Sequence, residues 1–218
     1  MLAKKVFPKL LQVFFHLLYH QFAWIYDFVA NMVSLGSWQK WVYTIRPYLH
    51  HEQILEIGFG PGHLQNELAK TGFRQVYGID ASFQMARQAQ KRITKAGISH
   101  RLAQSFSQAL PFPAHSFRQV VSTFPTEYAL DPRTIREVHR VLTAKGEWLI
   151  LPGVNITGKQ AKYKALKWLF DITHQTPGNL PDCFSRYREA GFDVKLIPIR
   201  TPNWKCEIIC CTIRGKTE

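Results

Sequence analysis

Three alternating glycines, Gly58, Gly60 and Gly62, form the most informative motif of this chain. They follow a short apolar run at residues 54–57, which is typical of a buried parallel strand. Residues 63–70 come next and predict a helix with one apolar face. Glycine lets the backbone turn tightly and lets a ligand approach it closely, and the N-terminus of a helix binds negative groups. The pattern therefore predicts a ligand-binding turn between a strand and a helix.

Two carboxylates accompany the glycine motif. Glu56 lies two residues before Gly58, and Asp80 ends a second apolar run, 22 residues after Gly58. An acidic residue at the end of the second strand can accept both hydroxyl groups of a ribose. The dinucleotide fingerprint Gly-x-Gly-x-x-Gly is not met, because the third glycine comes one place early and position 63 is His63. These residues predict a nucleoside ligand that carries a carboxylate and needs no diphosphate clamp, and they argue against a nicotinamide dehydrogenase.

Further helices and strands must position these groups. Helices are expected at 82–96, 131–146 and 181–190, and strands at 100–103, 117–124, 147–151, 192–199 and 205–213. Asp131 is a good N-cap and Pro132 suits the first helical position, while Gly146 is expected to end that helix. The last two strands are expected to form an antiparallel pair.

Several stretches of the chain resemble the class I S-adenosylmethionine (SAM) dependent methyltransferases, in particular the methyltransferase type 11, UbiE-like group. The resemblance begins with Leu55-Glu56-Ile57-Gly58-Phe59-Gly60-Pro61-Gly62 and Gly78-Ile79-Asp80. Three further stretches match in the same order, at residues 109–117, 120–124 and 137–146. The resemblance covers roughly residues 50 to 152. It is specific for the family and says nothing of the methyl acceptor.

The resemblance implies an α/β fold. Its expected form is a doubly wound, mostly parallel, seven-stranded Rossmann-like sheet with a C-terminal antiparallel hairpin and an N-terminal helical lid. It also implies SAM as the cofactor and methyl transfer as the reaction. Residues 50–218 would form the methyltransferase domain.

The same resemblance suggests a set of cofactor-binding residues. They are Tyr26, Glu56, Gly58, Gly60, Gly62, Asp80, Ala81, Met85, Ser105, Phe106, Thr123 and Phe124. Within this set, Glu56 would meet the methionine ammonium through water, and Asp80 would hold the ribose. Ala81 and Met85 would flank the adenine, with residues 105–107 on its other side. Thr123 and Phe124 would back the sulfonium, and Tyr26 would touch the methionine end.

One position departs from the family pattern. An acidic residue, which reads the adenine amino group, often stands where this chain has Phe106. Here the adenine would need a backbone or hydroxyl contact, with Phe106 packed on the ring.

Residues at the end of the fourth expected strand are the best candidates for acceptor contact, because open α/β sheets bind ligands at this edge. A base is needed where the nucleophile must lose a proton. Glu127 is the first candidate for this catalytic role and Tyr128 the second. Helix capping or a surface salt bridge is an equally good explanation of Glu127.

The charge of the chain is unusual for a globular protein. The 218 residues include 28 Lys and Arg against 15 Asp and Glu, a net charge of +13. Such a surface attracts nucleic acid or an anionic membrane, although a merely solvated basic surface is the simpler explanation. The four cysteines show no Cys-x-x-Cys spacing, so neither a disulfide scaffold nor a metal site is expected, and they are consistent with a reducing compartment.

The first 49 residues form an aromatic-rich segment that is expected to be helical. No Lys, Arg, Asp or Glu occurs from Leu10 to Tyr26. Polar residues interrupt the run needed for a transmembrane helix, and bulky aromatics fill the place of a signal cleavage site. The segment is therefore expected to cover the active site, to lie on a membrane surface or to pack on the core of the domain. A basic amphipathic helix is expected at 158–174. Packing of its apolar face on the core is favoured there, and a role facing phospholipid or nucleic acid is the alternative.

Taken together, these features predict a SAM-dependent methyltransferase that acts on a small, apolar or lipid-like acceptor. It would be cytoplasmic, with a peripheral position on the inner membrane face as an option. The alternatives are a methyltransferase of RNA or other nucleic acid and a SAM-binding scaffold without turnover.

Overall fold

A computed structural model describes residues 34, 36–97, 101–161, 163–164, 166–167 and 181–215. The expectations for Tyr26, for most of the segment 1–49 and for much of the helix at 158–174 lie outside the described residues. Within the described part, no helix is long and apolar enough to cross a membrane.

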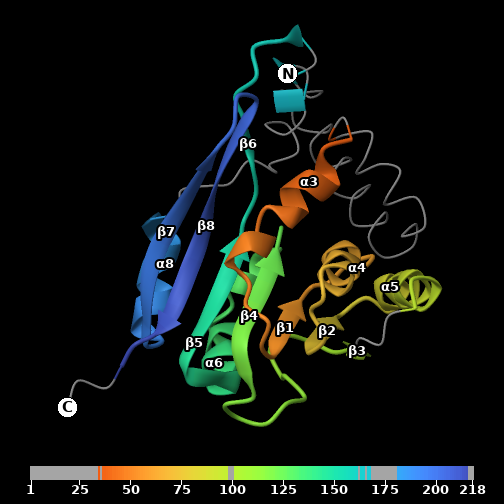
Figure 1. Cartoon of the computed structure of the whole chain (residues 1–218). Helices are drawn as coiled ribbons and strands as arrows, with labels where there is room; N and C mark the ends of the chain where they lie inside the picture. Colours follow the sequence, from red (N-terminus) through yellow and green to blue (C-terminus); the bar gives the residue numbers. More distant parts are fainter. Residues whose placement is uncertain are drawn as a thin grey trace, which may run out of the picture.

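Within the described residues, the fold is built on one mixed sheet of eight strands in the order β3-β2-β1-β4-β5-β8-β6, with β7 paired to β8 (Figure 1). The strands are β1 (Ile54–Ile57), β2 (Val76–Asp80), β3 (Arg101–Gln104), β4 (Phe117–Thr123), β5 (Leu142–Leu151), β6 (Asn155–Ile156), β7 (Phe192–Arg200) and β8 (Trp204–Ile213). The pairs from β3 to β5 are parallel. Strand β8 runs antiparallel to β5, β6 and β7. The expected doubly wound Rossmann-like sheet with a C-terminal hairpin is confirmed.

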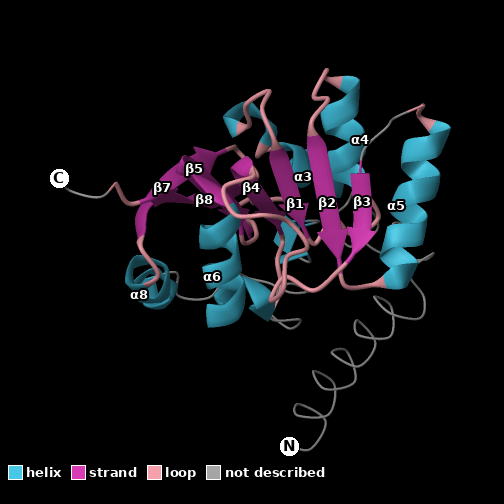
Figure 2. Ribbon diagram, turned by 90° about the horizontal axis from the view of Figure 1, so that it is seen from below, coloured by secondary structure: helices cyan, strands magenta, loops and turns pink. Residues whose placement is uncertain are grey.

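Helices cover both faces of this sheet (Figure 2). They are α3 (Trp38–Tyr43), α4 (His63–Lys70), α5 (Phe83–Lys95), α6 (Pro132–Val141) and α8 (Pro181–Glu189), with 3-10 turns η1 (Arg46–Tyr48) and η2 (Glu127–Leu130). Side chains alternate between the two faces along each strand. On β5, Leu149 and Leu151 pack with α3 and α4, while Trp148 and Ile150 pack with α6 and α8.

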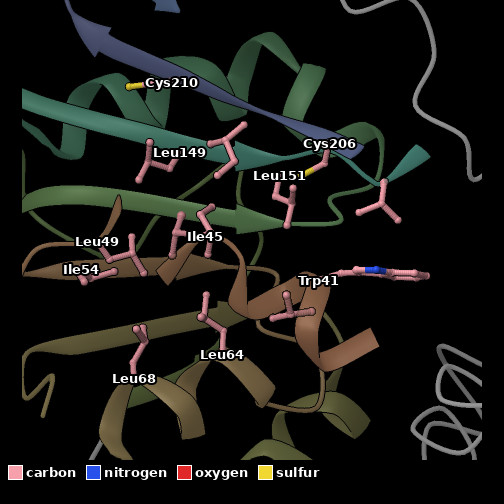
Figure 3. Close-up of a cluster of buried hydrophobic side chains, with 14 of the residues drawn as sticks. Trp41, Ile45, Leu49, Ile54, Leu64, Leu68, Leu149, Leu151, Cys206 and Cys210 are labelled. Carbon is pink, nitrogen blue, oxygen red and sulfur yellow. The ribbon is translucent and has the colours of Figure 1, made fainter. Parts of the chain in front are cut away.

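The core under α3 ties the start of the described chain to the sheet (Figure 3). Trp41 and Ile45 are fully buried against Ile54 of β1 and Leu64 of α4. At roughly 1.5–3 kcal/mol for each large apolar side chain removed from water, this contact fixes α3 beside the glycine turn.

Two expectations for individual elements are wrong. The helix α6 ends at Val141 instead of Gly146, because Leu142 pairs with Phe117 and begins the ten-residue strand β5. A bulge follows in this ladder before its regular pairing resumes. The sheet also has eight strands instead of seven, because the two-residue β6 pairs with the start of β8 through Asn155 and Ile156.

The parallel strands end at a common edge. Ile57 of β1 is in register with Ile79 of β2, and Asp80 is in register with Gln104 of β3. Strand β4 ends beside them at Thr123. The residues that follow these four strands therefore meet at one place, the carboxyl edge where open α/β sheets bind ligands.

Candidate active site

A cavity of about 610 Å³ opens at the carboxyl edge of the sheet. Nine of the expected cofactor residues line it, namely Glu56, Gly58, Gly60, Asp80, Ala81, Ser105, Phe106, Thr123 and Phe124. The candidate base Tyr128 also lines it. The sequence pattern thus predicted residues from four strands that the fold brings to one cavity.

The glycine turn follows β1 and shapes one side of this cavity. Gly60 has φ of +53°, and a Cβ there would meet no atom within 4 Å, so a ligand can approach this backbone. Gly62, with φ of +80°, does not line the cavity. A Cβ on it would lie 2.9 Å from the Cβ of Ala89, so this glycine is needed to pack the turn against α5.

Asp80 holds the glycine turn in place. Its Oδ2 accepts a hydrogen bond of 2.8 Å from the backbone N–H of Gly60, and its Oδ1 accepts one of 2.8 Å from Ser82. The side chain is almost fully buried yet reaches the cavity wall. A carboxylate at the end of the second strand is a group that can accept hydrogen bonds from the hydroxyl groups of a ribose.

Glu56 is a second buried carboxylate on the cavity wall. Burial raises its pKa from 4.5 to about 8; the hydrogen bond from Gln65 opposes this rise, and the charge of Asp80 adds to it. Gln65 donates from Nε2 to Glu56 Oε2 at 2.8 Å and to the carbonyl oxygen of Tyr77 at 3.3 Å. A positive group in the cavity would favour the ionised form of Glu56.

The cofactor that the resemblance implies, SAM, carries a cationic sulfonium, an ammonium and a ribose. The cavity offers two buried carboxylates and an open glycine backbone, which match these groups in charge and hydrogen bonding. The residues present therefore fit the cofactor.

Tyr128 supports the turn from the opposite side. Its hydroxyl donates a hydrogen bond of 2.8 Å to the carbonyl oxygen of Ile57, directly before Gly58. Burial raises the pKa of Tyr128 well above its ordinary value, so the phenol keeps its proton. This geometry supports a structural role for Tyr128 better than a role as base.

The other candidate base, Glu127, begins η2 and is exposed to solvent. Its neighbours Thr126 and Tyr128 line the cavity, but Glu127 is absent from the lining. His63 does line the cavity, as the first residue of α4, and is a titratable group that the sequence patterns did not assign to the site.

An aromatic wall closes the side of the cavity between α3 and β4. The rings of Trp38 and Phe124 lie with their centroids 4.5 Å apart, and Val42 and Pro125 line the same side. Phe124 has φ of +49°, an uncommon conformation for this residue. Its backbone N–H donates a hydrogen bond of 2.7 Å to the carbonyl oxygen of Leu151. Trp38 and Val42 belong to the segment 1–49 that was expected to cover the site, but no local sequence pattern singled out these two residues as part of the cavity wall.

The remaining expected residue lies elsewhere. Met85 is fully buried on α5, where its N–H donates to the N-cap hydroxyl of Ser82 at 3.3 Å, and it is absent from the cavity lining. Of the other residues expected beside the adenine, Ala81 and Phe106 both line the cavity.

The chain is similar to known methyltransferases. The family model described as "Methyltransferase domain" matches residues 54–146. Two solved structures share the fold. A SAM-dependent methyltransferase of Methanosarcina mazei superposes with a TM-score of 0.56 at 21% identity, over 79% of this chain and 98% of that chain. Phosphoethanolamine N-methyltransferase 2 of Haemonchus contortus, in complex with SAM, superposes with a TM-score of 0.60 at 16% identity, over 83% of this chain and 53% of that chain.

The match to a methyltransferase domain and the similarity to curated methyltransferases support a class I SAM-dependent methyltransferase, and the fold agrees with this class. SAM is its cofactor, and methyl transfer is its reaction class. A demethylmenaquinone methyltransferase of Symbiobacterium thermophilum is 27% identical over 84% of this chain and 88% of its own length. A 2-methyl-6-phytyl-1,4-hydroquinone methyltransferase of Oryza sativa is 25% identical over 83% of this chain and 56% of its own length.

Proposed function

We propose that this protein transfers the methyl group of SAM to a small, lipid-like acceptor of the quinone or hydroquinone type. Two relatives that align with more than four fifths of the chain are named for such acceptors. The acceptor of this chain is inferred from theirs together with the character of the cavity.

The main support for this proposal is that the cavity has one acidic side and one aromatic, apolar side. The side formed by β1 and β2 holds the buried carboxylates Glu56 and Asp80. The side formed by α3 and the end of β4 is aromatic and apolar, with Trp38 and Phe124 in contact. A cationic cofactor suits the first side, and a flat apolar acceptor ring suits the second.

The residues of the chain would act mainly by positioning. SAM supplies an electrophilic methyl group on a positive sulfur. Asp80 and Glu56 would hold the ribose and the ammonium, while Thr123, Phe124 and Trp38 would fix the acceptor next to the sulfonium. Holding the two reactants close and in line can supply much of the rate. Glu127 remains the proposed base, and His63 is a second candidate because it lines the cavity.

The test is methyl transfer by the purified full chain. The protein would be incubated with SAM and a chemically reduced, short-chain demethylmenaquinol, and the methylated product would be measured by mass spectrometry. Asp80→Ala serves as the control, because it removes the proposed ribose contact and the anchor of Gly60. Product from the wild-type chain alone supports the proposal. S-Adenosylhomocysteine binding without product from this acceptor would refute it.

The rival acceptor is nucleic acid, because the net charge is +13. The same assay with total RNA distinguishes it. Methyl transfer to RNA, with retention on heparin that falls steeply with salt, would favour the rival. If S-adenosylhomocysteine binds and no acceptor is methylated, the chain is a SAM-binding scaffold.

We also propose that the segment 1–49 covers the site or contacts an anionic membrane, at the cytoplasmic face, and that residues 50–218 form the catalytic domain. The described part of this segment supports a covering role, because Trp38 and Val42 line the cavity. Deleting residues 1–20 should lower sedimentation with vesicles that contain phosphatidylglycerol. Unchanged sedimentation would leave only the covering role.

A further inference from the structure

The strand order assigns the parts of the cofactor to parts of the cavity. Strands β1, β2 and β3 are neighbours, and they end at Glu56 with the glycine turn, at Asp80, and at the loop 105–108. With the ribose at Asp80 and the amino-acid portion at the glycine turn, the base extends toward β3. The adenine would therefore lie against Ala81 and the loop 105–108.

Gln108 lines this end of the cavity and has a fixed amide orientation. Its Nε2 donates to Asp131 Oδ2 at 3.1 Å. A carboxylate only accepts hydrogen bonds, so the nitrogen of the amide must face Asp131. The amide oxygen then points the other way and accepts from Ser107 Oγ at 3.3 Å. This carbonyl oxygen has a second lone pair, which leaves it able to accept from a ligand.

The partners of Gln108 are held by the first turns of α6. Asp131 is the N-cap of α6 and accepts from the N–H of Arg133 at 2.9 Å. The hydrogen bonds and charge of Arg133 hold the pKa of Asp131 well below its ordinary value, so the carboxylate stays ionised. Ser107 is buried and shares a hydrogen bond of 2.9 Å with the buried Thr134. The loop is thus ordered before a ligand binds.

We propose that Gln108, oriented by Asp131, accepts a hydrogen bond from the adenine amino group and makes the site select adenine over 6-oxopurines. This role is independent of the methyl acceptor. It concerns a residue that the sequence patterns did not single out.

The other groups in the loop cannot make this selection. Phe106 has no polar atom in its ring, and 67% of its surface is exposed. The buried Ser107 hydroxyl is already engaged by Gln108 and Thr134. The exposed Ser105 hydroxyl can rotate and either donate or accept, so it fits an amino group and a carbonyl group equally well. Among the polar side chains of the loop, Gln108 alone presents an acceptor of fixed direction.

The experiment compares two ligands by titration calorimetry on the full chain. S-Adenosylhomocysteine carries an amino group at position 6 of the purine, and S-inosylhomocysteine carries a carbonyl oxygen there. The carbonyl would face the amide oxygen of Gln108, and an unmet hydrogen bond of this kind lowers affinity about 10- to 100-fold. We expect the wild-type protein to prefer S-adenosylhomocysteine by this factor.

Three variants test the assignment. Gln108→Leu should bind the two ligands within about threefold of each other, because the acceptor is gone. Gln90→Leu is the matched control, since Gln90 is exposed on α5 and outside the cavity lining, and it should keep the wild-type preference. Asp131→Asn keeps an N-cap of equal quality but allows the Gln108 amide to turn and donate. This variant should bind S-inosylhomocysteine more tightly than the wild type does.

Tighter binding of S-inosylhomocysteine by Asp131→Asn cannot come from misfolding. This variant therefore keeps the proposal testable if Gln108→Leu is unstable. A wild-type preference below threefold would overturn the proposal. So would a preference that survives in both Gln108→Leu and Asp131→Asn. Loss of binding of both ligands to the wild-type chain would instead contradict the cofactor assignment.

Discussion

Replacing Glu56 by glutamine should separate the stability of the empty protein from its affinity for the cofactor. Burial raises the pKa of Glu56 from 4.5 to about 8 in the folded protein. Between these pH values the folded chain keeps a proton that the unfolded chain has lost. The contribution of protonated Glu56 to the unfolding free energy is therefore fully present below pH 4.5 and is lost as the pH rises through about 8.

The expected effect is large. One pKa unit corresponds to about 1.4 kcal/mol, so a rise from 4.5 to about 8 corresponds to about 5 kcal/mol of unfolding free energy. A whole domain has only about 5–15 kcal/mol. Glu56→Gln removes the titration and keeps a carbonyl oxygen for the hydrogen bond from Gln65. We expect this variant to gain several kcal/mol over the wild type between about pH 5 and about pH 9.

The assay is urea denaturation of both proteins across this pH range without ligand. Glu52→Gln is the control, because Glu52 is an exposed carboxylate just before the same strand. The difference between Glu56→Gln and the wild type should widen with pH, and the difference for the control should stay flat. Parallel pH profiles for Glu56→Gln and the wild type would refute the argument that burial suppresses ionisation of this carboxylate.

Cofactor binding gives a second measurement of the same group. At pH 7 the empty protein holds Glu56 largely protonated, since its pKa is about 8. A bound ammonium favours the carboxylate, so binding of S-adenosylhomocysteine should release a proton. Calorimetry in two buffers with different ionisation enthalpies counts this proton. The release should be absent in Glu56→Gln, whose affinity should also be lower.

Three further predictions concern the turn and the proposed base. Gly62→Ala should lower the unfolding free energy by about 1–3 kcal/mol in urea denaturation, because the new methyl group meets Ala89 at 2.9 Å and φ is +80°; an unchanged midpoint would contradict the close packing. Tyr128→Phe should cost about 1 kcal/mol by the same assay, because it removes the hydrogen bond to Ile57, and equal stability would argue against that bond. Glu127→Gln should leave the affinity for S-adenosylhomocysteine unchanged in calorimetry. If Glu127 is the base, the turnover of this variant should fall about 100-fold or more. Turnover equal to that of the wild type would show that Glu127 is not the base.

Local patterns predicted most of the elements. The strand, turn and helix around Gly58, Gly60 and Gly62 were predicted to the residue, since apolar runs and glycines act over a few positions. The start of α6 was also correct, because the cap and the first helical position are local choices of Asp131 and Pro132. The end of α6 was not, because the pairing of Leu142 with Phe117 depends on a strand 25 residues earlier.

The candidate site shows the same division. The sequence alone determined that β1, β2 and β4 end in residues suited to a nucleoside ligand, because strand ends and their chemistry are written in order along the chain. Only the tertiary structure decided which side chains from distant elements meet them. Gln65 reaches Glu56 from a helix face, Trp38 reaches Phe124 from α3, and Gln108 is oriented by the cap of α6. Such contacts arise from packing between elements, which no local spacing of residues specifies.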